Sequence, residues 1–150
     1  MWDYRLEDCA GTEPDAISVM MGYNDRVSTL LPSDVIDRLR RVRAAFPNVP
    51  IHVGGPWPGV ENFSARIVAT EQAIAAGVES MADPLIEFVP TIRRGDPWLT
   101  GAASQGTPAG ATGNSRYLIG YDNIHPTRRG ALHHARRWAE DFLAAMQSMI

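Results

Sequence analysis

Apolar residues occur along this chain in two patterns, as short continuous runs and as longer stripes at helical spacing. The continuous runs are Ala16–Met21, Pro50–Val53 and Ile86–Val89, and each is bounded by Gly or Pro. Short apolar runs between turn residues are typical of strands that are covered on both faces. The pattern therefore predicts three buried strands.

Helical stripes follow the three runs. We expect one helix from Ser33, a suitable N-cap, through Phe46, and a second over Asn62–Ala76 that ends at Gly77. A third is expected from Thr127 to the C-terminus, with an apolar stripe made of Leu132, Ala135, Trp138, Phe142 and Met146. Strands that alternate with helices predict an α/β fold, an open parallel sheet with right-handed crossovers.

One segment interrupts this alternation. Residues 95–120 hold six of the 13 glycines, with Ser, Thr, Pro and Asn between them. The segment is too long for a plain connector, and loops of this kind typically bind ligands or close over a site. We therefore expect an active-site loop over residues 95–120, within one domain that spans residues 1–150.

Composition and charge exclude several classes of protein. Hydrophobic residues make up 45% and charged residues 21%, as in globular domains. All 14 basic residues are Arg, and 17 acidic residues give a net charge of −3, so nucleic acid and anionic membranes are not expected partners. No apolar run reaches the roughly 20 residues of a membrane-spanning helix, and no signal-peptide pattern is present, which leaves the compartment open.

The first motif with candidate chemistry is Gly22-Tyr23-Asn24-Asp25, directly after the first predicted strand. Reactive groups of open α/β sheets gather at the carboxyl ends of the strands. The side-chain amide of Asn24 could there donate a hydrogen bond to a developing oxyanion. Alternatively, Asn24 and Asp25 form only a turn.

The second motif is Asp122-Asn123-Ile124-His125-Pro126, between the Gly-rich segment and the last predicted helix. An Asp three residues before a His can fold back on the imidazole, fix its tautomer and stabilise the imidazolium. Alternatively, His125 is an exposed loop residue and Asp122 is a turn or cap residue.

Together the two motifs resemble the SGNH (GDSL-type) hydrolases. Residues 14–25 look like the third sequence block of that family, a strand leading into G-x-N-D, and residues 122–130 look like its last block, D-x-x-H-P before a helix. The resemblance implies a flavodoxin-like parallel sheet with flanking helices. It also implies an esterase that transfers an acyl group to water, with His125 as general base and Asp122 as its orienting partner. Asn24 and Gly22 would form the oxyanion hole, and no metal or organic cofactor is implied.

The same family requires a nucleophilic Ser in an early G-D-S block and a Gly in a second block, and neither block is present in this sequence. A parallel strand–helix–strand unit takes about 30 residues or more, and only 15 residues precede Ala16. We therefore expect the sheet to be incomplete at its N-terminal side, with the nucleophile outside these 150 residues.

Other residues are weaker candidates for the nucleophile. Ser104, in Ala102-Ala103-Ser104-Gln105-Gly106, resembles a nucleophile elbow but has Gly-rich loop on both sides instead of a strand and a helix. Ser18 lies inside a predicted strand. Cys9, the single cysteine, excludes an internal disulfide and a multi-cysteine zinc site, and we expect it to be a small buried residue.

The remaining histidines are not expected to form a site. His52 lies within a predicted strand and is interpreted as a core or crevice-edge histidine with its hydrogen bonds satisfied. His133 and His134 are adjacent on the last predicted helix and face different directions, so they do not form a two-histidine metal site.

Two functions from different classes remain. The first is a piece of an SGNH-type esterase acting on a small, carbohydrate or lipid acyl ester, weak or inactive alone. The second is a catalytically inactive binding or structural domain with a hydrolase scaffold. If the strand Ala16–Met21 lacks its neighbours, its exposed edge predicts a homodimer or pairing with a complementing N-terminal segment.

Overall fold

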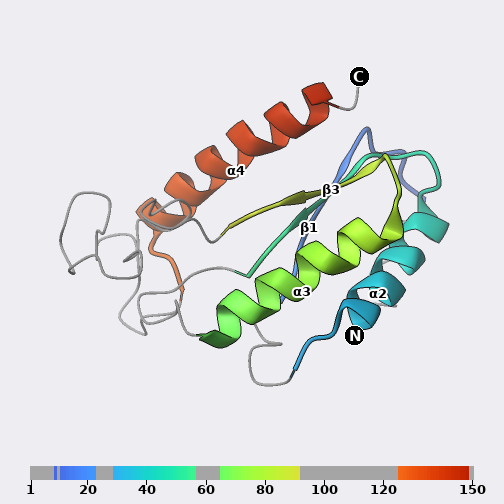
Figure 1. The fold of residues 1–150 in the computed structure, drawn as a ribbon. Helices are drawn as coiled ribbons and strands as arrows, with labels where there is room; N and C mark the ends of the chain where they lie inside the picture. The colour runs from blue at the N-terminus through green and yellow to red at the C-terminus, as the bar shows by residue number, and fades with distance from the viewer. Residues whose placement is uncertain (1–8, 10, 23–28, 57–64, 92–124, 149–150) are drawn as a thin grey trace.

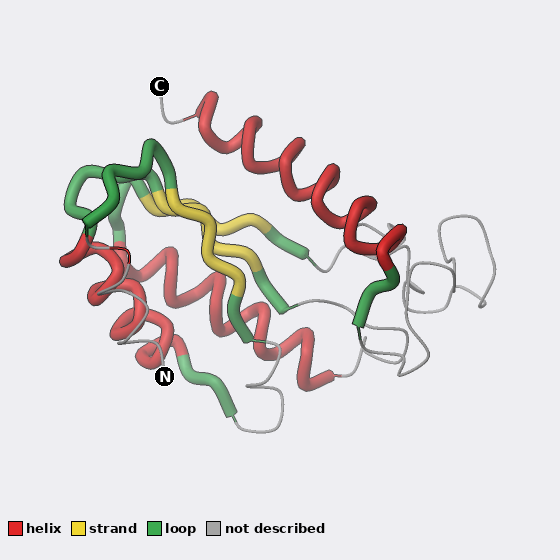
Figure 2. Tube along the Cα trace, turned by 180° about the vertical axis from the view of Figure 1, so that it is seen from behind, coloured by secondary structure: helices red, strands yellow, loops and turns green. Residues whose placement is uncertain are grey.

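A computed structural model of the chain describes residues 9, 11–22, 29–56, 65–91 and 125–148. Six elements alternate along the described residues: β1 (Ile17–Met20), α2 (Pro32–Ala45), β2 (Ile51–Gly54), α3 (Ala65–Met81), β3 (Ile86–Val89) and α4 (Arg128–Ser148). The strands form one parallel sheet in the order β1-β2-β3. Helices α2 and α3 cover one face and α4 covers the other (Figures 1 and 2). The predicted α/β fold with a parallel sheet and flanking helices is confirmed.

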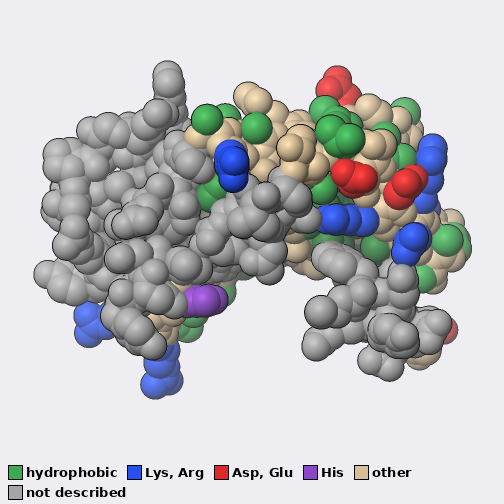
Figure 3. All heavy atoms as spheres, turned by 90° about the horizontal axis from the view of Figure 1, so that it is seen from below, with side chains coloured by type: hydrophobic (Ala, Val, Ile, Leu, Met, Phe, Trp, Pro, Cys, Tyr) green, Lys and Arg blue, Asp and Glu red, His purple; other side chains and the backbone are tan. Residues whose placement is uncertain are grey.

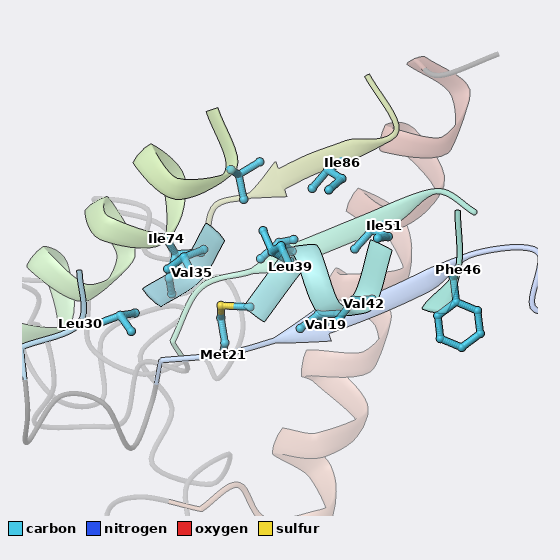
Figure 4. Packing of buried hydrophobic residues seen from close by; sticks show 12 residues of the cluster. Val19, Met21, Leu30, Val35, Leu39, Val42, Phe46, Ile51, Ile74 and Ile86 are labelled. Carbon is cyan, nitrogen blue, oxygen red and sulfur yellow. The ribbon is translucent and has the colours of Figure 1, made fainter. Parts of the chain in front are cut away.

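The main core lies between the sheet and the pair α2–α3. Side chains of a strand alternate between its two faces, and Ile51 and Val53 of β2 point toward α2 and α3, where both are fully buried. The same cluster includes Val19 of β1 and Leu39 of α2 (Figure 4). Apolar burial on this face fixes the order and register of the strands, because a shift by one residue would expose these side chains.

Strand β1 differs from the prediction of a strand covered on both faces. It lies at the edge of the sheet, and only Val19 of its four residues is buried, while Ser18 and Met20 are exposed. In the part of the chain that is described, no strand pairs with the outer edge of β1.

The predicted end of the second helix at Gly77 is wrong, because α3 continues to Met81. Residues 62–64 of the predicted helix lie outside the described residues. A Cβ on Gly77 would lie 2.6 Å from the Cβ of Val35 in α2. The glycine therefore serves the close approach of α2 and α3, and packing outweighs its low helix propensity of about 1 kcal/mol relative to Ala.

The predicted N-cap Ser33 is also wrong. Helix α2 begins at Pro32, with Leu31 as the N-cap residue. The Asp34 carboxylate accepts a hydrogen bond of 2.9 Å from the Leu31 backbone N–H. Pro is favoured at the first helical position and an acidic side chain satisfies a free N–H there, so these residues together move the N-cap two positions earlier, from Ser33 to Leu31.

The last helix is confirmed, but its apolar stripe is only partly correct. Trp138, Phe142 and Met146 are half-buried, whereas Leu132 and Ala135 are exposed. Helix α4 runs antiparallel to the strands, and Trp138 already lies on Gly54, the last residue of β2. The first turns of α4 therefore extend beyond the strands. None of the helices described is long and apolar enough to cross a membrane.

Candidate functional site

The candidate site lies at the carboxyl edge of the sheet, where the strands end on the same side as the first turn of α4 (Figure 1). Of the residues predicted to form the site, Gly22 and His125 are described. Asn24, Asp122 and Ser104 lie outside the described residues, as does the loop of residues 95–120. The structure thus gives the scaffold of the site and two of its positions.

Gly22 occupies a position that requires glycine. It follows β1 with a φ of +97°, in the left-handed region that L side chains rarely adopt. A Cβ there would lie 2.8 Å from Ile74 Cδ1 and 2.8 Å from Thr70 Cγ2, both on α3. The chain therefore turns sharply off β1 at the carboxyl edge, two residues before Asn24 in the sequence.

His125 is exposed and lies three residues before α4. Thr127 caps the helix, because its Oγ1 accepts a hydrogen bond of 3.1 Å from the Gly130 N–H. From Trp138 to Arg128 the helix extends about 15 Å at 1.5 Å per residue. His125 therefore lies beyond the ends of the strands, on the side of the sheet where the first turn of α4 lies.

A polar cluster that the sequence did not indicate joins the ends of β2 and β3 to α3. The Glu71 Oε1 accepts a hydrogen bond of 2.6 Å from the Thr91 N–H and lies 3.0 Å from the Thr91 Oγ1. The Thr91 hydroxyl also donates to the Pro56 carbonyl oxygen, at 2.8 Å. Gly55 leaves room for the carboxylate, because a Cβ there would lie 2.7 Å from Glu71 Oε1. This cluster fixes the residues that follow the carboxyl ends of β2 and β3 against α3.

A signal for this cluster exists in the sequence. Glu71 follows Ile67 by four residues, so a charged side chain borders the buried stripe of α3. An acidic residue beside a buried stripe needs a donor partner.

His52 does not fit its predicted environment. The residue is buried as expected, but neither ring nitrogen has a hydrogen-bond partner among the described residues, so the expectation of satisfied hydrogen bonds is wrong. The Phe142 ring packs edge-on against the imidazole, with centroids 4.5 Å apart. Burial lowers the pKa of His52, and the Glu87 carboxylate partly opposes this effect. The ring lies under α4 and not at the carboxyl edge.

The two remaining nucleophile candidates that are described do not lie at the carboxyl edge. Ser18, within β1 as predicted, accepts a hydrogen bond of 2.7 Å from the Trp138 indole Nε1. Cys9 is exposed, which corrects the prediction that it is buried.

Charge and metal-ligand patterns do not mark a second site on the described surface. Figure 3 shows Arg and acidic side chains interspersed on the face that it draws. Over the described ranges, no group of three or more His, Cys, Asp and Glu side chains could hold a metal ion.

Comparison with known proteins gives similarity in structure only. No family model and no curated protein matches the sequence. Among solved structures, a carbohydrate esterase family 3 protein from Talaromyces cellulolyticus is 20% identical, with a TM-score of 0.60 over 93% of this chain and 62% of that one. The salicylyl-acyltransferase SsfX3 from a tetracycline biosynthetic pathway is 15% identical, with a TM-score of 0.63 over 93% of this chain and 40% of that one.

A mutant acetyl esterase with an acetate ion is 20% identical, with a TM-score of 0.58 over 97% of this chain and 69% of that one. This chain thus spans between two fifths and about two thirds of the length of these three proteins. Nearly all of it superposes on each, and the chain has the α/β fold of these esterases and this acyltransferase.

Proposed function

We propose that this chain carries part of the active site of an SGNH-type ester hydrolase. The observation that carries the proposal concerns Gly22 and His125, which belong to the two motifs of the family. Gly22 follows the carboxyl end of β1, and His125 precedes α4, whose first turn lies on the same side of the sheet in an esterase-like fold. Ligands of open α/β sheets bind at this edge. The substrate is an acyl ester of a small alcohol, a carbohydrate or a lipid.

In the proposed reaction, His125 takes the proton of a serine hydroxyl while the serine oxygen attacks the ester carbonyl. Asn24 and the turn at Gly22 stabilise the resulting oxyanion. The tetrahedral species expels the alcohol, which receives the proton from His125, and an acyl-enzyme remains. Water, deprotonated by His125, then attacks the acyl carbonyl. The second tetrahedral species releases the acid as the bond to the serine oxygen breaks, and His125 returns the proton to that oxygen. Asp122 holds the tautomer of His125 throughout.

The nucleophilic serine is proposed to come from outside these 150 residues, because the sequence contains no G-D-S block. The serine would reach the site on a complementing segment or a partner chain that pairs beside β1. Ser104 is the alternative nucleophile within the chain. Labelling with a fluorophosphonate probe distinguishes it from an external serine.

The pairing of Asp122 with His125 is tested by the nitrogen chemical shifts of the His125 ring in specifically labelled protein. If Asp122 accepts the Nδ1 proton, neutral His125 should be mainly the Nδ1–H tautomer, and Asp122→Ala should shift it toward Nε2–H. Asp37→Ala, on the exposed surface of α2, is the matched control and should change nothing. An Nε2–H tautomer in the unmodified chain would contradict the proposed roles.

The location of the nucleophile is tested with a fluorophosphonate probe and p-nitrophenyl acetate. The 150-residue chain should react with neither above background, because His125 has no serine to activate. Labelling of Ser104 that is lost in His125→Ala would show instead that the chain holds its own nucleophile. In that outcome the esterase proposal stands and the external serine is rejected.

A further inference from the structure

One residue of α4 touches all three strands of the sheet. The Trp138 Nε1 donates a hydrogen bond of 2.7 Å to the Ser18 Oγ of β1. The six-membered ring of the Trp138 indole lies against Gly54 of β2, so closely that a Cβ on Gly54 would overlap it, 2.7 Å from Cζ3. Trp138 also packs against Val89 of β3 and Ala145 of its own helix. It is therefore the central contact between α4 and the sheet.

Among the described residues, few other buried apolar contacts join α4 to the sheet. The buried apolar cluster there contains Val89 and Ala145 with Trp138 packed against them. The Phe142 ring adds an edge contact with His52. Two large apolar residues of α4, Leu132 and Leu143, are more than half exposed and add little to the attachment. The position of α4 along the strands therefore depends strongly on the one indole.

Two residues that are uncommon in buried strands, Ser18 and Gly54, both contact the Trp138 indole. Ser18 is the polar residue in an otherwise apolar strand, Ile17–Met20, and its hydroxyl receives the indole proton. Gly54 is the last residue of β2, and glycine is uncommon within strands. Because Gly54 has no Cβ, the Trp138 ring can occupy the space beside it. Two strands thus each contribute a matching feature to Trp138.

We propose that Trp138 is a positioning residue, which sets the place of His125 over the carboxyl edge by fixing α4 against β1 and β2. This inference rests on the proposed function for the role of His125. Ser18 lies four residues before Gly22, so the same hydrogen bond links the helix that follows the base to the strand that leads to the oxyanion motif. A slip of α4 by one turn would move His125 by about 5 Å, enough to break a hydrogen bond to a reacting group.

The attachment is measured by the distance between spin labels at exposed positions of α2 and α4. In a Cys9→Ser background, Arg40→Cys and Leu132→Cys supply the two labels, and both native side chains are exposed. Trp138→Phe keeps an aromatic ring but removes the indole donor. It should broaden the distance distribution or shift its peak by several Å, on the order of one helical turn. Leu143→Ala, on the exposed side of α4, is the control and should leave the distribution unchanged.

A double substitution separates the fit of the ring from general destabilisation. Gly54→Ala alone should displace the ring and shift the label distance, whereas Gly54→Ala combined with Trp138→Leu should lie closer to the unmodified distance than either single change. Two results would overturn the proposal. One is a folded Trp138→Phe chain with an unchanged label distance. The other is a double variant whose shift in label distance equals the sum of the Gly54→Ala and Trp138→Leu shifts.

The positioning role is then read from the His125 ring. Trp138→Phe and Ser18→Ala should both reduce the Nδ1–H tautomer of His125, although neither residue touches it. A shifted label distance with an unchanged tautomer would show that Trp138 holds the helix but does not position the base. If the unmodified chain lacks this tautomer, the proposed function fails, while the label distances still decide whether Trp138 fixes α4.

Discussion

At Gly22 the chain leaves β1 with a positive φ and with α3 side chains at the place where a Cβ would be. Both constraints act on the same residue, and both exclude other side chains. His52 differs from Gly22: its imidazole is buried, but neither ring nitrogen has a hydrogen-bond partner among the described residues. These two residues carry the predictions that belong to single positions.

Gly22→Ala should lower the free energy of unfolding by about 1–3 kcal/mol, since it combines a left-handed backbone with overlaps at Ile74 and Thr70. Urea denaturation followed by circular dichroism measures the change. Gly11→Ala is the matched control, because a Cβ at Gly11 meets nothing within 4 Å. Its effect should stay within about 0.5 kcal/mol. Equal effects at the two glycines would contradict the turn geometry.

His52 should make stability depend on pH. Burial holds the pKa of the folded-state imidazole below its ordinary value of 6.5. Below pH 6.5 the unfolded chain therefore binds more protons than the folded chain, and the free energy of unfolding falls as the pH falls. The dependence fades as the pH rises about one unit above 6.5, where both states carry a neutral ring.

Denaturation series at several pH values measure this slope. His52→Leu should remove it, and should also raise stability at pH 6 by about 1 kcal/mol, because an unpaired buried polar group is replaced by an apolar one. A His52→Leu chain with the original slope would show that another group causes it.

At the scale of elements, one arginine joins three segments at the amino edge of the sheet, opposite the candidate site. The Arg43 Nε donates to Asp83 Oδ2 at 2.7 Å, and its Nη1 donates to Val49 O at 2.7 Å and to Phe46 O at 3.0 Å. Its Nη2 donates to Leu85 O at 3.2 Å. The guanidinium thus connects the end of α2 with the turns that lead into β2 and β3.

Arg43→Met should lower the free energy of unfolding by about 2–4 kcal/mol, because Asp83 and several carbonyl groups lose a partly buried, charged donor. Thermal and urea denaturation measure it. Arg40→Met, at an exposed residue with a 3.7 Å pair to Asp37, should change stability by less than about 0.5 kcal/mol. If the two substitutions cost the same, Arg43 does not hold these segments together.

At the scale of the whole molecule, β1 is an edge strand and the least buried of the three described strands. Its outer edge has no partner strand in the described residues, and Met20 is 36% exposed. Edges of this kind pair with other chains. We expect the 150-residue chain to associate through β1, either with a second copy or with a complementing segment.

Size-exclusion chromatography with light scattering tests this expectation. Met20→Lys places a charge beside the edge and should shift the chain toward the monomer. Leu143→Lys, at an exposed position of α4, should not. A stable monomer of the unmodified chain across the accessible concentration range would contradict the pairing edge.

The three strands and the three helices of the described residues could be predicted from the sequence because each depends on a local period. Apolar runs between turn residues and stripes at helical spacing are short-range features. Two boundaries failed: the start of α2 depends on its neighbours Pro32 and Asp34, whereas the end of α3 depends on a distant residue. Gly77 continues α3 because it packs against Val35, more than 40 positions earlier in the chain.

Part of the candidate site could likewise be predicted from local sequence patterns, and part depended on distant residues. The motifs around Gly22 and His125 were found in the sequence because each is a compact group of residues next to a strand or helix end. The link between Glu71 and Thr91 was not found, because the two residues lie 20 positions apart on different elements. Hydrogen bonds of that kind depend on how helices cross the sheet, which no local pattern contains.

By itself, the sequence of this protein determined the type and order of its elements, and hence the parallel sheet with its reactive edge at the carboxyl ends of the strands. Only the tertiary structure decided that Ser18 and Met20 of β1 are exposed, why Gly22, Gly54 and Gly77 must lack a side chain, and how α4 is held. Trp138 and Ser18 are 120 residues apart. Their contact exists because the sheet and α4 bury apolar surface together, a free energy that depends on the whole fold.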